Sequence, residues 1–197
     1  MGKFKFNITM LEYSLLNEED KDLVDYTVKN FIKSNKILRV KKFFRQIDLQ
    51  PKVNTLWELS WEDLLLLRSA ISKSDIDSIF NIVYELKPEQ MKSLEVFNVF
   101  ASFNWISDEL KAISNAEMER LHSELTNEEK EAGAEELIDY GYYSTLKAMC
   151  PDLLKHNEYL KLSYSIVFRD MAHTKLINKI NKKYNEIIAH KNKPKRK

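Results

Sequence analysis

The stretch LWELSWEDL, from Leu56 to Leu64, holds two of the three tryptophans, four residues apart. At that spacing, two side chains on one helix lie on the same face, one turn from each other. A tryptophan ring needs a broad apolar environment and a partner for its indole N–H. We therefore expect Trp57 and Trp61 to form one anchor face of a helical domain.

The composition favours helices in the rest of the chain. With only 3 glycines and 4 prolines in 197 residues, most of the turns that a β-rich fold needs are missing. The hydrophobic fraction of 44% is sufficient for a core in a chain of this length. Basic and acidic residues nearly balance, at 31 and 30, so the overall charge does not attract a polyanion.

The number of cysteines and the length of the apolar runs indicate in which cellular compartment the protein is expected. The single cysteine, Cys150, cannot form an internal disulfide, which favours a reducing compartment or one whose redox state is indifferent. The sequence contains no apolar run as long as a membrane-spanning helix, and its start lacks the apolar core of a signal peptide. We therefore expect neither export nor a membrane partner.

The N-terminal fifty residues combine strand and helix patterns. Apolar and polar residues alternate over 4–10, which predicts a short strand, and Asn17 then opens a helix with three acidic residues in its first turn. The segment 36–47 fits either a strand or an amphipathic helix, and we favour an extended segment that pairs with the N-terminal strand. Residues 1–50 are therefore predicted as a separate segment with short strands and one helix.

After Pro51, capping residues mark the starts of successive helices. Ser60 and Ser74 each precede acidic residues, as N-caps do, and Pro88 suits the first turn of a helix. Gly141 is expected to end one helix in the left-handed conformation. The predicted helices run over about 60–71, 75–86, 88–101, 105–125, 126–141 and 158–190, with a short turn or helix at 142–149.

The last predicted helix is unusually long. A helix of roughly 30 residues spans about 45 Å, more than the domain needs to cover its core, and its apolar spacing slips once near Thr174. We expect its far end to project or to meet a partner. The predicted fold is mainly α, a multi-helix array over 51–190 with a long C-terminal helix, a small N-terminal β element, and a disordered basic tail at 191–197.

Charge is unevenly distributed along the chain. Six glutamates and one lysine lie between residues 124 and 136, whereas residues 175–197 hold eight lysines, one arginine and one glutamate. A second basic segment covers 33–45, and both basic segments could contact phosphates. Neither is accompanied by a recognition motif, so a solvated surface is the favoured interpretation and nucleic acid is not an expected partner. The candidate phosphate contacts are Lys41, Lys42, Arg45, Lys195, Arg196 and Lys197.

Motifs for catalysis and metal binding are missing from the sequence. The four histidines are spread singly, whereas a metal site needs convergent ligands. Glycines only at positions 2, 133 and 141 leave no glycine-rich phosphate loop. Cys150 and His156 lie close enough in sequence to suggest a nucleophile and its base, but a structural thiol is the favoured interpretation. We therefore expect a non-enzymatic protein with no catalytic residue, metal or cofactor.

Five segments have an order and pattern that can be compared with a known family. They are LWELSWEDL at 56–64, WISDELKAI at 105–113, AGAEEL at 132–137, YGYYSTL at 140–146 and LSYSIVF at 162–168. Together they resemble a family of small helical proteins of tailed-bacteriophage structural modules, the tail assembly chaperones and related virion-assembly proteins. The resemblance covers about residues 55–190 and rests on pattern, without a diagnostic motif.

The resemblance implies a protein that shields or organises another phage structural protein in the host cytoplasm during assembly, with the tail-lumen protein as the expected partner. Binding would use apolar helical faces, and aromatic residues are the usual hot spots. Three alternatives stay open: a structural component retained in the virion, a nucleic-acid-binding regulator, and a homo-oligomer. The candidate partner-binding residues are Trp57, Trp61, Trp105, Tyr142 and Tyr143, although packing in the core is the simpler role for each.

Overall fold

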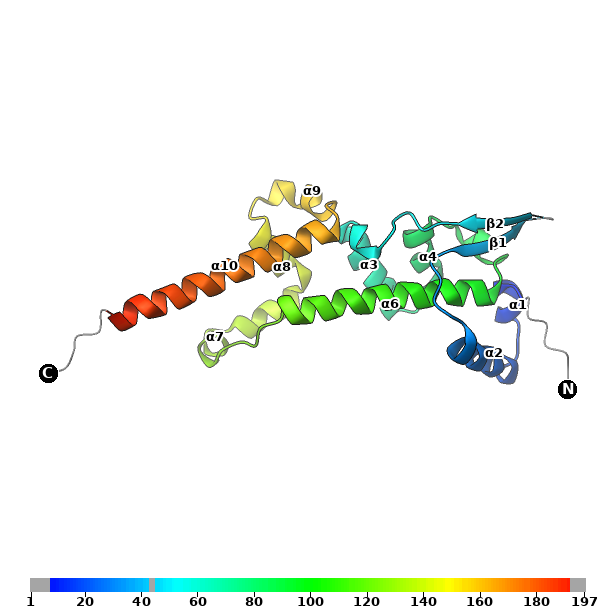
Figure 1. Ribbon diagram of the computed structural model, residues 1–197, viewed down its shortest axis with the longest axis horizontal. Coiled ribbons are helices and arrows are strands. Elements are labelled where there is room, and N and C mark those ends of the chain that lie inside the picture. Colours follow the sequence, from blue (N-terminus) through cyan, green and yellow to red (C-terminus); the bar gives the residue numbers. More distant parts are fainter. Residues whose placement is uncertain (1–7, 43–44, 192–197) are drawn as a thin grey trace. The chain divides into compact units, whose positions relative to one another are not determined.

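The computed structural model describes residues 8–42 and 45–191 (Figure 1). The fold is mainly α-helical, with a long C-terminal helix and a two-stranded antiparallel sheet near the N-terminus, as the sequence predicts. The chain divides into two compact units, Met1–Ile113 (unit 1) and Ser114–Lys197 (unit 2). This division differs from the boundary predicted near residue 50, because Val24 and Val28 share a buried cluster with Val96.

Short connections join most of the helices and strands. The symbol η denotes a short 3-10 helix. Unit 1 contains α1 (Met10–Ser14), α2 (Glu18–Phe31), β1 (Leu38–Lys42), β2 (Arg45–Leu49), η1 (Leu56–Glu58), α3 (Trp61–Ser72), α4 (Ile76–Tyr84), α5 (Pro88–Met91) and most of α6 (Val96–Arg120). Unit 2 contains the end of α6, then α7 (Asn127–Glu131), η2 (Ala134–Tyr140), α8 (Tyr142–Met149), η3 (Leu153–Lys155), α9 (His156–Leu160) and α10 (Tyr164–Lys191).

The structure describes only residues 8–10 of the predicted N-terminal strand, and a helix replaces the strand pattern from Met10 onward. Thr9 forms a single β-bridge with Glu95, and its side chain caps α1, which begins at Met10. The predicted residues 4–7 lie outside the described part of the chain. Asn17 caps α2 through the backbone N–H of Asp20, which confirms the predicted start of that helix.

The described residues of 36–47 include β1 and the start of β2, which fits the favoured extended structure, and these two strands pair with each other. The register places Leu38 opposite Leu49 and Lys42 opposite Arg45. Of the predicted N-terminal strand, the described residue Thr9 pairs with Glu95 and not with β1, and residues 4–7 lie outside the described part of the chain. The Tyr84 hydroxyl donates to the Lys36 carbonyl oxygen at 2.8 Å, which ties the hairpin to α4.

Trp57 and Trp61 do not share a helix, which corrects the first expectation. Trp57 lies in η1, and Trp61 is the first residue of α3. Ser60 caps α3 by accepting a hydrogen bond from the Asp63 backbone N–H. An N-cap residue has non-helical backbone angles, and Ser60 has φ −59° and ψ 153°. The predicted cap is therefore the reason why the two tryptophans belong to different elements.

Several other predicted caps and helix ends also differ from the structure. Asp75, not Ser74, caps α4, because Ser74 has a left-handed φ of 55°. The helix α6 is continuous where a break was predicted between 101 and 105. Gly133, with φ 82°, separates α7 from η2, and α10 begins at 164, not near 158. Gly141 has the expected positive φ of 51°, but its ψ of −129° is not that of a left-handed helix.

Unit 1 should lose stability at alkaline pH because of two tyrosines, Tyr84, which is buried, and Tyr13, which is partly buried. Burial is the main cause that raises the pKa of Tyr13 and of Tyr84, each to about 12. A tyrosine in the unfolded chain titrates near pH 10, at about its ordinary pKa. A raised folded-state pKa stabilises the protein fully below the unfolded pKa, and that contribution is lost as the pH rises through the folded one. We expect the unfolding temperature to fall between about pH 10 and about pH 12.

Thermal unfolding followed by circular dichroism across this alkaline range measures the effect. The double variant Tyr13→Phe/Tyr84→Phe is the control, because phenylalanine does not titrate. It should start less stable and decline less steeply with pH. Equal slopes for the two proteins would contradict the assignment.

Candidate protein-binding surface

The helix α10 has two apolar faces that point in opposite directions. In its first half, Tyr164, Val167 and Phe168 are buried. From 176 to 191 every residue is exposed. At about 100° per residue, the centre of the second apolar set lies about half a turn around the helix from the first. The exposed set, named here the α10 stripe, consists of Leu176, Ile177, Ile180, Tyr184, Ile187 and Ile188.

The first half of α10 is held by specific contacts inside unit 2. The Tyr164 hydroxyl donates to the Glu117 carboxylate at the end of α6. The Tyr159 hydroxyl of α9 donates to Asp170 Oδ2 at 2.8 Å, and burial, followed by this hydrogen bond, raises the pKa of Tyr159 above its ordinary value. Lys175 donates to the His122 carbonyl oxygen. These contacts fix how α10 is rotated about its axis.

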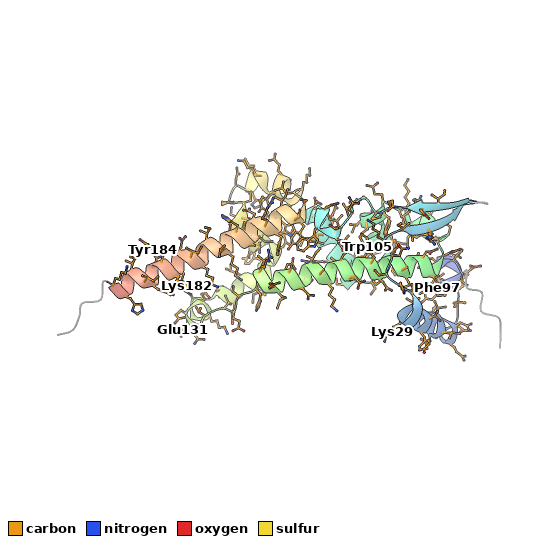
Figure 2. All side chains as sticks on the ribbon, viewed as in Figure 1. Lys29, Phe97, Trp105, Glu131, Lys182 and Tyr184 are labelled. Carbon is orange, nitrogen blue, oxygen red and sulfur yellow. The ribbon has the colours of Figure 1, made fainter. Side chains whose placement is uncertain are left out.

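That rotation turns the α10 stripe away from α7. Continued beyond Met171, the buried face would pass through polar residues such as Asn178 and Lys182. The pKa of Glu128 in α7 is lowered, first by a backbone hydrogen bond and by Thr126, and further by the charge of Lys182. Figure 2 shows Lys182 on the side of α10 nearer Glu131, and Tyr184 on the other side.

The α10 stripe has the spacing of a helix-binding face. Ile177, Ile180, Tyr184 and Ile187 follow one another at steps of 3, 4 and 3 residues, the repeat by which one helix packs along another. Tyr184 is 62% exposed and Ile180 53% exposed. The geometry therefore presents a row of apolar side chains to a partner helix.

A groove with basic walls adjoins the stripe. It has a volume of about 700 Å³ and lies between α10 and the end of α6. Phe168, Ala172 and Leu176 supply apolar groups to its lining. The charged and titratable lining residues are Glu119, Arg120, His122, Arg169, His173, Lys175 and Lys179. Only one of these residues, Glu119, is acidic, whereas four are lysines or arginines. This side of α10 is therefore positively charged at neutral pH.

A second exposed apolar cluster covers η2 and the start of α8. Positive φ angles at Gly133 and Gly141 bracket η2, and the Ser144 hydroxyl donates to the Leu137 carbonyl oxygen at 3.1 Å. Three exposed acids, Glu135, Glu136 and Asp139, lie among the apolar residues. The exposed apolar members, named here the η2–α8 patch, are Leu137, Ile138, Tyr140, Tyr142 and Tyr143.

The predicted aromatic contacts fall into two classes. Trp61 is only 4% exposed and belongs to the core of unit 1, and Trp57 and Trp105 are partly buried. Tyr142 and Tyr143 are 50% and 41% exposed, so their side chains are open to a partner. The Tyr143 ring also packs edge-on against His156, with ring centroids 5.8 Å apart.

The predicted phosphate contacts are only partly placed. Lys41 and Lys42 lie in β1 and Arg45 lies in β2, where Lys42 and Arg45 are opposite each other. Lys195, Arg196 and Lys197, with the rest of the predicted tail from residue 192, lie outside the described residues. Lys191, the first residue of that predicted tail, is the last residue of α10.

The residues of the α10 stripe were not among the sequence candidates. Their spacing alone resembles that of any amphipathic helix, which usually buries its apolar face. The available signal was the slip near Thr174, because it moves the apolar residues to the other side of the helix. A slip within one helix therefore separates the buried face from an exposed one.

Other parts of the described chain are less informative about function. His156 Nε2 lies 2.8 Å from the Cys150 carbonyl oxygen, so this pair of residues meets through the backbone. Within residues 8–42 and 45–191, no group of three or more His, Cys, Asp or Glu residues is placed to hold a metal ion. None of the described helices combines the length and apolar character needed to cross a membrane. No protein-family model, curated protein or solved structure matches the chain.

Proposed function

We propose that this chain is a non-enzymatic binding protein whose α10 stripe receives an apolar helical segment of another protein. One observation carries the proposal: six large apolar side chains are exposed on a helix face that is turned away from the chain's own unit. Full burial of such a side chain is worth about 1.5–3 kcal/mol. A contiguous exposed set of this kind is typical of an interaction site.

The resemblance over residues 55–190 supports a more specific proposal. In it, the protein is a tail assembly chaperone of a tailed bacteriophage, and the partner is the tail-lumen protein of the same gene cluster. A long partner with repeated apolar helical segments would suit the α10 stripe. Binding to the stripe requires apolar residues at steps of 3 and 4, but it does not require particular side chains at those positions.

Co-expression with the tail-lumen protein tests this function. We expect the two proteins to co-purify and the tail-lumen protein to become more soluble. The double variant Ile180→Asp/Tyr184→Asp should abolish both effects, because it places two carboxylates in the apolar stripe. Leu154→Asp is the matched control, since Leu154 is an 89% exposed apolar residue of the same unit outside the stripe.

If the wild-type protein neither co-purifies with the tail-lumen protein nor changes its solubility, the chaperone proposal fails. Mass spectrometry of purified virions then separates the remaining alternatives. A chaperone should be absent from the particle, whereas a retained structural component should be present in stoichiometric amount. Co-purification that survives the Ile180→Asp/Tyr184→Asp change would mean that another surface binds the partner.

A further inference from the structure

Two exposed surfaces of unit 2 have complementary chemistry. The α10 stripe is apolar and lies in a segment, residues 175–191, that holds five lysines and one glutamate. Lys179 and Lys183 lie along one flank of the stripe by helical position. The η2–α8 patch is also apolar, but Glu135, Glu136 and Asp139 lie within it. Apolar groups would meet apolar groups, and lysines would meet carboxylates, if the two surfaces came together.

These two surfaces do not meet within one chain. The apolar residues of both are exposed: Leu137 is 58% exposed and Ile138 70% exposed, as against 53% for Ile180. The face of α10 nearer α7 carries Lys182, and the stripe is on the other side. Each chain therefore presents both surfaces with much of their apolar area exposed.

Pairing of α10 with α10 of a second copy fits the charges less well. Each helix would bring five lysines and one glutamate over residues 175–191, so the contact would join two segments of the same sign. Contact with the acidic patch brings opposite signs together, which attracts the partners and fixes their register. Charge therefore selects the patch over a second stripe.

We propose that the η2–α8 patch of one copy docks on the α10 stripe of a second copy. The proposal rests on the same α10 surface as the proposed function, so self-association and binding of another protein would compete. The contact is head-to-tail, because it joins two different surfaces. It leaves one stripe and one patch open at the ends of each assembly, so growth continues until a ring closes or a filament forms.

Sedimentation velocity of the full chain over a range of concentrations tests the proposal. We expect the mass to rise from the monomer value of 23.3 kDa to species larger than dimers, and to fall again at high salt, which screens the lysine–carboxylate attraction. Ile180→Asp/Tyr184→Asp removes the stripe, and Leu137→Asp/Ile138→Asp removes the patch. Each variant alone should remain monomeric.

A mixture of the two variants gives the sharpest outcome. One variant keeps an intact patch and the other an intact stripe, so their mixture should form a complex of about twice the monomer mass and no larger species. Leu154→Asp should associate like the wild type. Circular dichroism checks that each variant is folded, and the milder changes Tyr184→Ser and Tyr140→Ser should weaken association if a double variant does not fold.

Three results would overturn the proposal. They are a wild type that stays at 23.3 kDa at every concentration, a patch variant that still associates alone, and a mixture that remains monomeric. The second of these would indicate pairing of α10 with α10. None of the three affects the proposed function, because co-purification with the tail-lumen protein needs only the stripe.

Discussion

Replacing Tyr164 by alanine is expected to lower the free energy of unfolding of unit 2 by about 3–5 kcal/mol, whereas Tyr184→Ala should change it by less than about 0.5 kcal/mol. The two tyrosines lie on the same helix, but Tyr164 is 2% exposed and Tyr184 is 62% exposed. Tyr164 fills the core and donates to the Glu117 carboxylate, and its loss would leave a cavity and remove that hydrogen bond.

Urea unfolding measures the change in the free energy of unfolding for both variants. Hydrogen exchange of the α10 backbone amides is a second measurement, which shows where in α10 the change occurs. Amides of the first half of α10 should exchange faster in Tyr164→Ala and at the wild-type rate in Tyr184→Ala. Tyr164→Phe keeps the ring and removes the hydroxyl, so it should cost about 1.5–3 kcal/mol, the value of a hydrogen bond to a charged group. Similar destabilisation by both alanine variants would contradict the assignment of two opposite faces to α10.

Local chemistry explains which parts of the fold were predictable. Asn17 and Ser60 cap helices as predicted, and Pro88 starts α5, because each acts on backbone groups within a few residues. Asp75 took the place of Ser74, since both can cap and only the backbone conformation decides between them. Signals that act over one turn of helix are therefore readable in sequence to within about a residue or two.

Features that depend on distant contacts were not predictable in the same way. The part of α6 past residue 101 makes contacts distant in sequence, such as the hydrogen bond from the Leu56 backbone N–H to Glu109 Oε2 at 3.1 Å. The cluster of Val24, Val28 and Val96 joins α2 to α6, and both belong to unit 1, which ends at Ile113. Neither contact can be predicted from the local pattern of apolar residues.

The candidate site shows the same limit. Aromatic residues suit both cores and interfaces, so residue type alone did not separate Trp61 from Tyr142. The order of residues along the chain did predict the uneven charge, and the structure places the acidic η2 and the basic α10 in the same unit. What the sequence could not show is that the apolar residues among those charges are exposed, because exposure depends on the rotation of α10 and on the turns at Gly133 and Gly141.

Trp61→Ala is expected to destabilise unit 1 by about 3–5 kcal/mol and to leave binding by unit 2 unchanged. Trp61 is 4% exposed at the start of α3, beside the fully buried Leu64. Trp57 is only partly buried, in η1, so Trp57→Ala should cost less. The reason is the same in both cases, since the cost follows the apolar area and the packing that are lost.

Chemical unfolding and sedimentation velocity of the same samples separate the two roles. Tyr142→Ala is the matched control: Tyr142 is 50% exposed, so the change should alter stability by less than about 1 kcal/mol and weaken self-association. For Trp61→Ala, unfolding should shift to much lower denaturant while the folded protein still associates. If Trp61→Ala kept its stability and lost association, Trp61 would be a partner-binding residue and its burial in unit 1 would be contradicted.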